Sequence, residues 1–129
     1  MERKKVEDLT LEEAKKAIAD LNIFKKAHKL KILAAKNEKT LRSTEKRLLK
    51  EKKSKHLKSL QTEINSASTK SAKDLKRKNK TRKTNSFDSQ ISAKDRQIDQ
   101  TEIKISNIKR DIEQIEMNIL IIKRHIDSL

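Results

Sequence analysis

Apolar residues recur at steps of three and four along the N-terminal part of the chain. They are Ala14, Ala17, Ile18, Leu21, Phe24 and Ala27, and the stripe continues through Leu30 and Ala34. This period is typical of an amphipathic helix. Thr10 and Glu13 have the spacing of a capping box, which predicts that the helix begins near Leu11. Asn37 and Thr40 are compatible with a break near residues 37–40, but one continuous helix over 11–60 fits equally well.

Isoleucine recurs every seventh residue in the last third of the chain. The a and d positions of the resulting heptad repeat include Ile98, Ile105, Ile108, Ile112, Ile115, Ile119, Ile122, Ile126 and Leu129. A sustained repeat of 3.5 residues is a strong coiled-coil signal, and it predicts a helix over residues 87–129. A core helix of a small bundle would use the same face, so that alternative stays open.

Charges beside this seam favour an antiparallel partner. In a parallel homo-oligomer, like charges such as Lys104 and Lys109 would oppose each other. In an antiparallel pair, Glu102 would face Lys123 and Lys109 would face Glu116, so both contacts attract. We therefore expect a homo-oligomer with antiparallel pairing preferred. Isoleucine at both a and d would instead favour parallel trimers or tetramers, so the number of subunits stays open.

A second apolar patch lies on the far side of the same helix. It consists of Ile103, Met117, Leu120 and Ile121. A two-stranded coiled coil would leave this patch in water. We expect the apolar stripe of the N-terminal helix to cover it, with the chain folding back through residues 61–86. Ser, Thr, Asn and Lys dominate that segment, which predicts a polar connection or a solvated helical arm.

Composition supports an all-α fold. The 129 residues include two Phe and no Gly, Pro, Cys, Trp or Tyr. This composition excludes disulfides and is unsuited to a β-sandwich or a doubly wound α/β fold. We expect long helices forming a coiled coil, a helical hairpin or a small bundle. The three expected regions are a basic amphipathic helical region (1–60), a Lys/Ser-rich connection or solvated helix (61–86) and the isoleucine-heptad coiled coil (87–129).

The sequence offers no recognisable catalytic or metal-binding constellation. His28, His56 and His125 lie far apart, and none has a second histidine three or four residues away. Without glycine there is no phosphate-cradling loop, and no serine has a recognisable base beside it. We expect a protein that is not an enzyme and that uses no metal or cofactor.

The termini and the hydropathy pattern predict the protein's location. The first residues are charged, no signal-peptide-like apolar stretch follows them, and no run approaches the ~18–20 apolar residues of a membrane span. We expect an intracellular protein, cytoplasmic or, in a eukaryote, nuclear, with no membrane partner. A role at a membrane surface would need bulky apolar anchors beside lysines, and only Phe24, Leu30 and Leu33 offer them.

Positive charge is concentrated in the middle of the chain. The formal net charge is +15; residues 23–90 contribute +16, residues 1–22 contribute −1 and residues 91–129 contribute 0. One predicted contact surface is a stripe at helical spacing, Lys39, Arg42, Lys46, Lys50 and Lys53. The other is a cluster formed by Lys76, Arg77, Lys78, Lys80, Arg82 and Lys83. Such arrays bind phosphate backbones through the release of counterions, regardless of base sequence.

The composition of these basic segments indicates the kind of ligand. No aromatic residue lies among the cations, so stacking on single-stranded bases is not expected. We expect a non-enzymatic basic coiled-coil oligomer that binds duplex DNA or structured RNA largely without sequence preference. The alternative is a structural or scaffold protein that assembles through coiled-coil contacts with a protein partner. A lysine-rich face that only keeps the protein in solution would look the same in the sequence.

Overall fold

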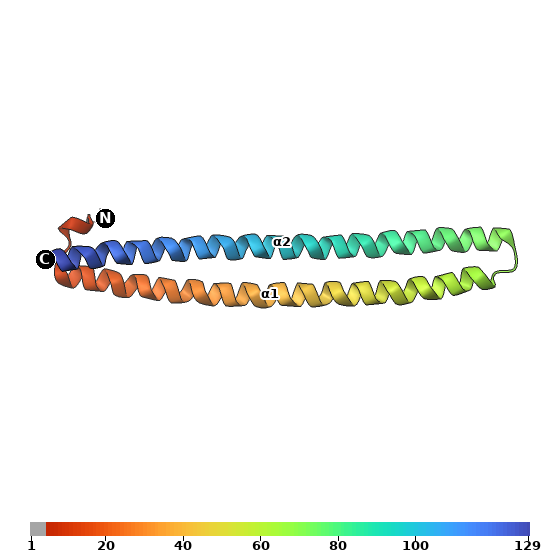
Figure 1. Cartoon of the computed structure of the whole chain (residues 1–129), viewed down its shortest axis with the longest axis horizontal. Helices are drawn as coiled ribbons and strands as arrows, with labels where there is room; N and C mark the ends of the chain where they lie inside the picture. The colour runs from red at the N-terminus through yellow and green to blue at the C-terminus, as the bar shows by residue number, and fades with distance from the viewer. Residues whose placement is uncertain (1–4) are drawn as a thin grey trace. The chain divides into compact units, whose positions relative to one another are not determined.

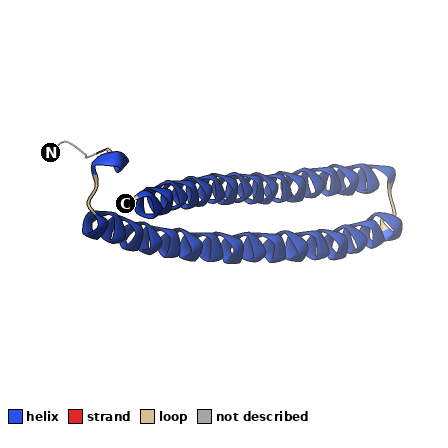
Figure 2. Cartoon of the chain, turned by 60° about the vertical axis from the view of Figure 1, so that its left-hand side comes forward, coloured by secondary structure: helices blue, strands red, loops and turns tan. Residues whose placement is uncertain are grey.

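The computed structural model describes residues 5–129. A 3₁₀ turn, η1 (Val6–Asp8), precedes two long helices, α1 (Leu11–Ser66) and α2 (Lys70–Ser128). The helices pack against each other as a helical hairpin, and residues 5–129 contain no strand (Figures 1 and 2). The all-α expectation is therefore confirmed, and the hairpin is the arrangement found among those expected.

The start of α1 is fixed by the predicted capping box. The Thr10 backbone N–H donates to Glu13 Oε1 at 3.3 Å, and the Glu13 N–H donates to Thr10 Oγ1 at 3.2 Å. Two backbone donors that the helix leaves free are thereby satisfied. The helix then continues without a break to Ser66, so neither Asn37 nor Thr40 ends it. The Thr44 hydroxyl, one turn further along α1, donates to the Thr40 carbonyl oxygen at 3.0 Å.

A short turn after Ser66 leads into α2. The Ala72 N–H donates to Thr69 Oγ1 at 3.1 Å, so the threonine caps the new helix. The helix begins at Lys70, well before the start near Phe87 that the heptads suggested. Because the intervening residues include no Gly or Pro, nothing in them breaks a helix once it is capped. The polar segment 61–86 is thus helical on both sides of a turn.

The helical hairpin consists of two compact units, each described by itself. Unit 1 comprises the N-terminal residues up to Asn37 together with Glu102–Leu129, and unit 2 comprises Glu38–Thr101. Within each unit, α1 and α2 run antiparallel. The residue numbers of side chains that pair between the helices add up to 139 or 141 in either unit. This near-constant sum defines the register of the two helices.

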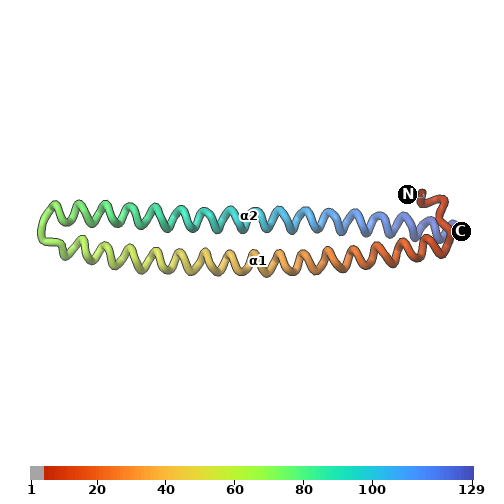
Figure 3. Tube along the Cα trace, turned by 180° about the vertical axis from the view of Figure 1, so that it is seen from behind, coloured from red at the N-terminus to blue at the C-terminus, as the bar shows by residue number. Residues whose placement is uncertain are grey.

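Isoleucine dominates the core of unit 1, where α1 and α2 run side by side (Figure 3). The buried side chains are Ile105, Ile108, Ile112, Ile119 and Ile122 of α2, with Ala14 and Ala35 of α1. The register places Ala35 opposite Ile105, so a large side chain of α2 packs against a small one of α1. At the end of the unit, His125 Nε2 lies 2.8 Å from the Leu9 carbonyl oxygen, which links α2 to the segment before α1. Burial of the isoleucine face is the main source of stability in this unit.

The seam of α2, rather than its outer patch, packs against α1. The outer residues Ile103, Met117, Leu120 and Ile121 remain exposed. The expectation that the N-terminal helix covers them was therefore wrong. The apolar stripe expected on α1 was also only partly right, because Ile18 and Leu21 face the seam whereas Phe24 and Leu30 are exposed. One α1 helix cannot cover both faces of α2, and the seam offers more apolar area.

Unit 2 has a sparse apolar core. Ile64 and Phe87 are its buried apolar side chains. The Phe87 ring lies 5.6 Å from the His56 ring, centroid to centroid, with the planes tilted by 44°. Several other positions of the seam in this unit carry charged side chains, and these include residues predicted to bind nucleic acid.

Candidate nucleic-acid interface

The basic stripe predicted on α1 faces α2. Lys46 Nζ lies 2.5 Å from Asp95 Oδ1, and Lys53 Nζ lies 2.5 Å from Asp88 Oδ1. Both lysine side chains are 28% exposed. Each lysine therefore lies along the seam with its ammonium group turned to a carboxylate at the edge of α2. These two cations hold the hairpin together within unit 2.

The remaining members of the stripe differ in their exposure. Arg42 is half-buried, and its Nη1 donates to Glu45 Oε1 at 2.9 Å. Lys39 is half-buried as well, whereas Lys50 is exposed. Only Lys50 among the five predicted residues therefore presents its side chain mainly to solvent.

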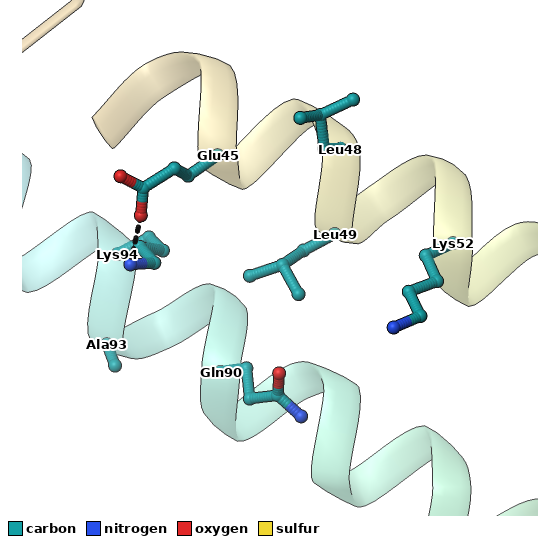
Figure 4. Close-up of a pocket in the computed structure, with 7 residues that line it drawn as sticks. All are labelled: Glu45, Leu48, Leu49, Lys52, Gln90, Ala93 and Lys94. Carbon is teal, nitrogen blue, oxygen red and sulfur yellow. Dashed lines mark hydrogen bonds and ion pairs between the residues drawn. The ribbon is translucent and has the colours of Figure 1, made fainter. Parts of the chain in front are cut away.

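A second lysine enters this seam from α2. The register places Lys94 opposite Lys46, and each has its own carboxylate. Lys94 pairs with Glu45 (Figure 4), and Lys46 pairs with Asp95. The hydrogen bond from Lys94 has the largest effect on Glu45 and lowers its pKa. Burial opposes this effect, and the charges of Lys94 and Arg42 lower the pKa further, so that the net shift is downward. Two like charges are tolerated across the seam because each is neutralised locally.

A groove of about 500 Å³ lies beside the Glu45–Lys94 pair in unit 2. Its other lining residues are Leu48, Leu49, Lys52, Gln90 and Ala93. Figure 4 shows Leu49 pointing toward α2 and Leu48 pointing away from it. The groove offers apolar contacts with a polar edge.

The predicted basic cluster lies on α2 close to the turn. Its exposed members are Arg77, Lys78, Arg82 and Lys83, and its half-buried members are Lys76 and Lys80. Lys80 Nζ donates to Gln61 Oε1 at 2.6 Å, and Arg77 Nη1 donates to Asp74 Oδ1 at 3.3 Å. The Arg77 side chain is nevertheless 62% exposed. Most of this cluster thus presents its charge to solvent, although Arg77 and Lys80 also line a groove with Gln61 and Ile64 of α1.

Charge is divided unequally between the units. Unit 2 holds 19 Lys and Arg against 8 Asp and Glu, a net charge of +11. Unit 1 holds 15 against 11, a net charge of +4. Unit 2 therefore has the stronger attraction for a polyanion, even after its internal ion pairs are formed.

The residues predicted to mediate oligomerisation lie along the seam of α2. Ile105, Ile108, Ile112, Ile119 and Ile122 are buried, Ile98, Ile115 and Ile126 are half-buried, and Leu129 is exposed. Their packing partner within the chain is α1. Self-association through these residues would require a second chain to replace α1, and it stays a prediction.

Sequence reasoning missed the carboxylates that neutralise the basic stripe. Asp95 was seen only as a flanking charge of the coiled coil, and Asp88 was not singled out. A signal was present, because Lys39, Lys46 and Lys53 are spaced by seven, in phase with Ile18 and Ile32 of the same helix. A cation in phase with the isoleucines of a helical stripe indicates a position facing the partner helix.

Three comparisons with known proteins were made. Family models, curated proteins and solved structures gave no match to this chain. Within residues 5–129, no helix carries an apolar stretch sufficient to span a bilayer. The function is therefore argued from the chemistry of the surface alone.

Proposed function

We propose that the protein is a non-enzymatic nucleic-acid-binding protein whose unit 2 contacts the phosphate backbone of duplex DNA or structured RNA. The observation that carries this proposal is the net charge of +11 on unit 2, with four cations of the 76–83 cluster exposed to solvent. Counterion release upon phosphate neutralisation supplies the affinity.

The two predicted sets of cations have different roles in this proposal. Lys46 and Lys53 are engaged by carboxylates, so they stabilise the hairpin and contribute little to binding. Lys78, Arg82 and Lys83 are exposed and lie on successive turns of α2. The proposed interface is centred on these three residues, with Lys50 contributing from α1.

The interface is suited to phosphate rather than to bases. The chain has two Phe and no Trp or Tyr, and the Phe of unit 2, Phe87, is buried against α1. Phosphate contacts fix position and carry no direct sequence information. We therefore expect similar affinities for duplexes of unrelated sequence.

A salt titration tests the proposal. Binding of labelled duplex DNA and structured RNA should weaken linearly with the logarithm of salt, with a slope near −0.9 per phosphate neutralised on duplex. The variant K78Q/R82Q/K83Q should reduce the magnitude of that slope by up to about 2.7. Its matched control, K109Q/R110Q/K123Q, removes the same charge from exposed positions of unit 1 and should change the slope much less.

Two outcomes would contradict the proposal. Wild type could show no binding at ~50 mM salt, in which case the charge only keeps the protein in solution. The control variant could also lower the slope as much as the unit 2 variant does, which would mean that binding follows total charge and has no site.

A scaffold role is the second candidate. It is favoured by large apolar residues that remain exposed on α2, including Ile103, Met117 and Leu120. Surface patches of this kind are typical of protein–protein contacts. A defined protein partner held with little dependence on salt would support this role in place of nucleic-acid binding.

A further inference from the structure

The outer face of α1 in unit 1 carries four large apolar side chains that the hairpin does not use. Ile23 is 66% exposed, Phe24 56%, Leu30 67% and Leu33 56%. All four lie within twelve residues of one helix. Single exposed apolar residues are ordinary, whereas a cluster of four on one short stretch of helix indicates a contact surface.

Helical geometry places this cluster on the side away from α2. Ile18, Leu21 and Ile32 follow the seam, and the positions half a turn away are those of Ile23 and Leu30. Phe24 and Leu33 flank these two residues on either side. The four side chains therefore form the outward surface of α1, which we call the outer apolar face.

Lysines predominate around this face, and Asp20 is an acidic neighbour at its N-terminal end. Between Asp20 and Glu38 the sequence contains no acidic residue and five lysines. Lys25 points inward, with its Nζ 3.1 Å from Glu116 Oε1. Lys26, Lys29 and Lys31 are exposed, and they lie around the apolar side chains. An apolar strip bordered by lysines is the pattern of a helix that lies in the interface of an anionic membrane.

We propose that the outer apolar face of unit 1 binds the surface of a membrane that contains anionic lipids. The apolar side chains enter the boundary between headgroups and acyl chains, and the lysines reach outward to lipid phosphates and carboxylates. A second copy of the chain is a poorer occupant, because the same face would set lysines against lysines. This proposal revises the sequence-based expectation of no membrane partner, which rested on the absence of a long apolar run and on the small number of bulky apolar anchors beside lysines, Phe24, Leu30 and Leu33.

The membrane proposal is independent of nucleic-acid binding, and one set of variants separates the two. In F24Q/L30Q/L33Q the charge is unchanged, and glutamine is a good helix former. We expect its partition to vesicles of phosphatidylcholine with about one third phosphatidylserine to fall at least tenfold in co-sedimentation. Its salt slope on duplex DNA should stay that of wild type. In the variant K78Q/R82Q/K83Q, duplex DNA binding should be weakened more than partition to the vesicles.

A matched variant on the other helix identifies the face. M117Q/L120Q/I121Q removes three exposed apolar side chains from the outward side of α2 in the same unit. Because that side of α2 points away from α1, the partition of this variant to the mixed vesicles should stay within about twofold of wild type. An equal loss in the two triple variants would overturn the assignment to α1.

Insertion can be observed directly because the chain contains no Trp. In F24W the indole is the sole tryptophan, and its emission should shift to shorter wavelength when the mixed vesicles are added. In M117W the emission should not shift. Circular dichroism of each variant confirms that the helices are retained.

Three results would overturn the proposal. F24Q/L30Q/L33Q could bind the mixed vesicles as wild type does, which would show that charge alone holds the protein there. The F24W emission could stay unshifted. In the absence of vesicles, wild type could form a dimer that the triple variant loses in sedimentation velocity, which would make a second copy the occupant.

Discussion

The two units pair the same two helices with different side chains. In unit 1 the seam consists of isoleucines from α2 against alanine and isoleucine of α1. In unit 2 the seam consists of a few apolar residues separated by lysines and carboxylates. Burial of a large aliphatic side chain contributes about 1.5–3 kcal/mol, whereas an exposed ion pair contributes about 0–1 kcal/mol.

This difference assigns the units different tasks. Unit 1 provides most of the free energy that holds the helical hairpin closed, and unit 2 provides the positive charge. A seam of ion pairs also specifies register, because a shift by one residue would separate each ammonium group from its carboxylate. We therefore expect unit 2 to open more readily than unit 1.

The largest effect should come from charging the core of unit 1. The I112D variant places a carboxylate among buried isoleucines, and we expect it to lose about 3 kcal/mol or more of unfolding free energy. The control I121D makes the same change at an exposed position and should cost about 0.5 kcal/mol. Urea unfolding followed by circular dichroism measures both. Equal losses would show that Ile112 is not part of a buried seam.

Removing the aromatic side chain of unit 2 should have the next largest effect. The F87A variant loses the buried ring and its contact with His56, and we expect a loss of about 3 kcal/mol of unfolding free energy. The exposed Phe24 supplies a matched control, since F24A should cost about 0.5 kcal/mol or less. Amide hydrogen exchange locates the effect. Faster exchange in unit 1 than in unit 2 would contradict the assignment of Phe87 to the core of unit 2.

The ion pairs of unit 2 should contribute less. Because the pairs of Lys46 and Lys53 are partly exposed, K46Q/K53Q should lose about 1 kcal/mol in total. Raising the salt concentration should speed amide exchange in unit 2 of wild type and should change it little in this variant. A salt effect of the same size in both proteins would mean that these pairs do not hold the seam.

The smallest effect should be the dependence on pH. The pKa of Glu45 is lowered in the folded state, so its contribution to stability is present above the ordinary value of about 4.5 and is lost as the pH falls through the lower folded pKa. The E45Q variant should remove this part of the acid sensitivity of unit 2. The E113Q variant, which removes an exposed carboxylate of unit 1, should keep it. Exchange rates corrected for intrinsic pH dependence provide the measurement.

Much of unit 1 could be predicted from the sequence. The heptad of Ile105, Ile112 and Ile119 identifies a buried seam, and Thr10 with Glu13 identifies the start of α1. These signals are local, because a repeat or a cap is visible without knowledge of the partner. The partner itself was not predictable in this way, since the isoleucine face fits a second chain as well as it fits α1.

The face that α1 turns to its partner was harder to predict. The helix carries two apolar stripes, one through Ile18 and Ile32 and the other through Phe24 and Leu30. Periodicity alone does not show which of the two stripes packs against α2. The stripe through Ile18 and Ile32 is the one that does so in the structure. The same reason explains why the basic stripe was placed on the solvent side, because lysine is common on exposed faces and rare in seams.

Polar residues at heptad positions also made the length of α2 difficult to predict from the sequence. Lys94 and Thr101 occupy d positions, which weakened the repeat toward the start of the helix. The structure shows how each is accommodated: Lys94 pairs with Glu45, and the buried Thr101 hydroxyl donates to the Gln97 carbonyl at 2.8 Å. Such local compensation depends on rotamers and on the opposite helix, and the sequence does not display either.

The register of the two helices governs how the length of this hairpin can change. A deletion of seven residues from α1 alone, between Lys53 and the turn, would bring Lys46 opposite Asp88 and Lys39 opposite Asp95. It would also move Ala35 by about 10 Å from its place opposite Ile105, so the packing of unit 1 would lose its register. A deletion of seven residues on each side of the turn, 60–66 together with 70–76, would keep the original pairs in place. Insertions and deletions in this part of the gene are therefore compatible with the fold chiefly as matched pairs of heptads, so that natural variants should differ in length by multiples of fourteen.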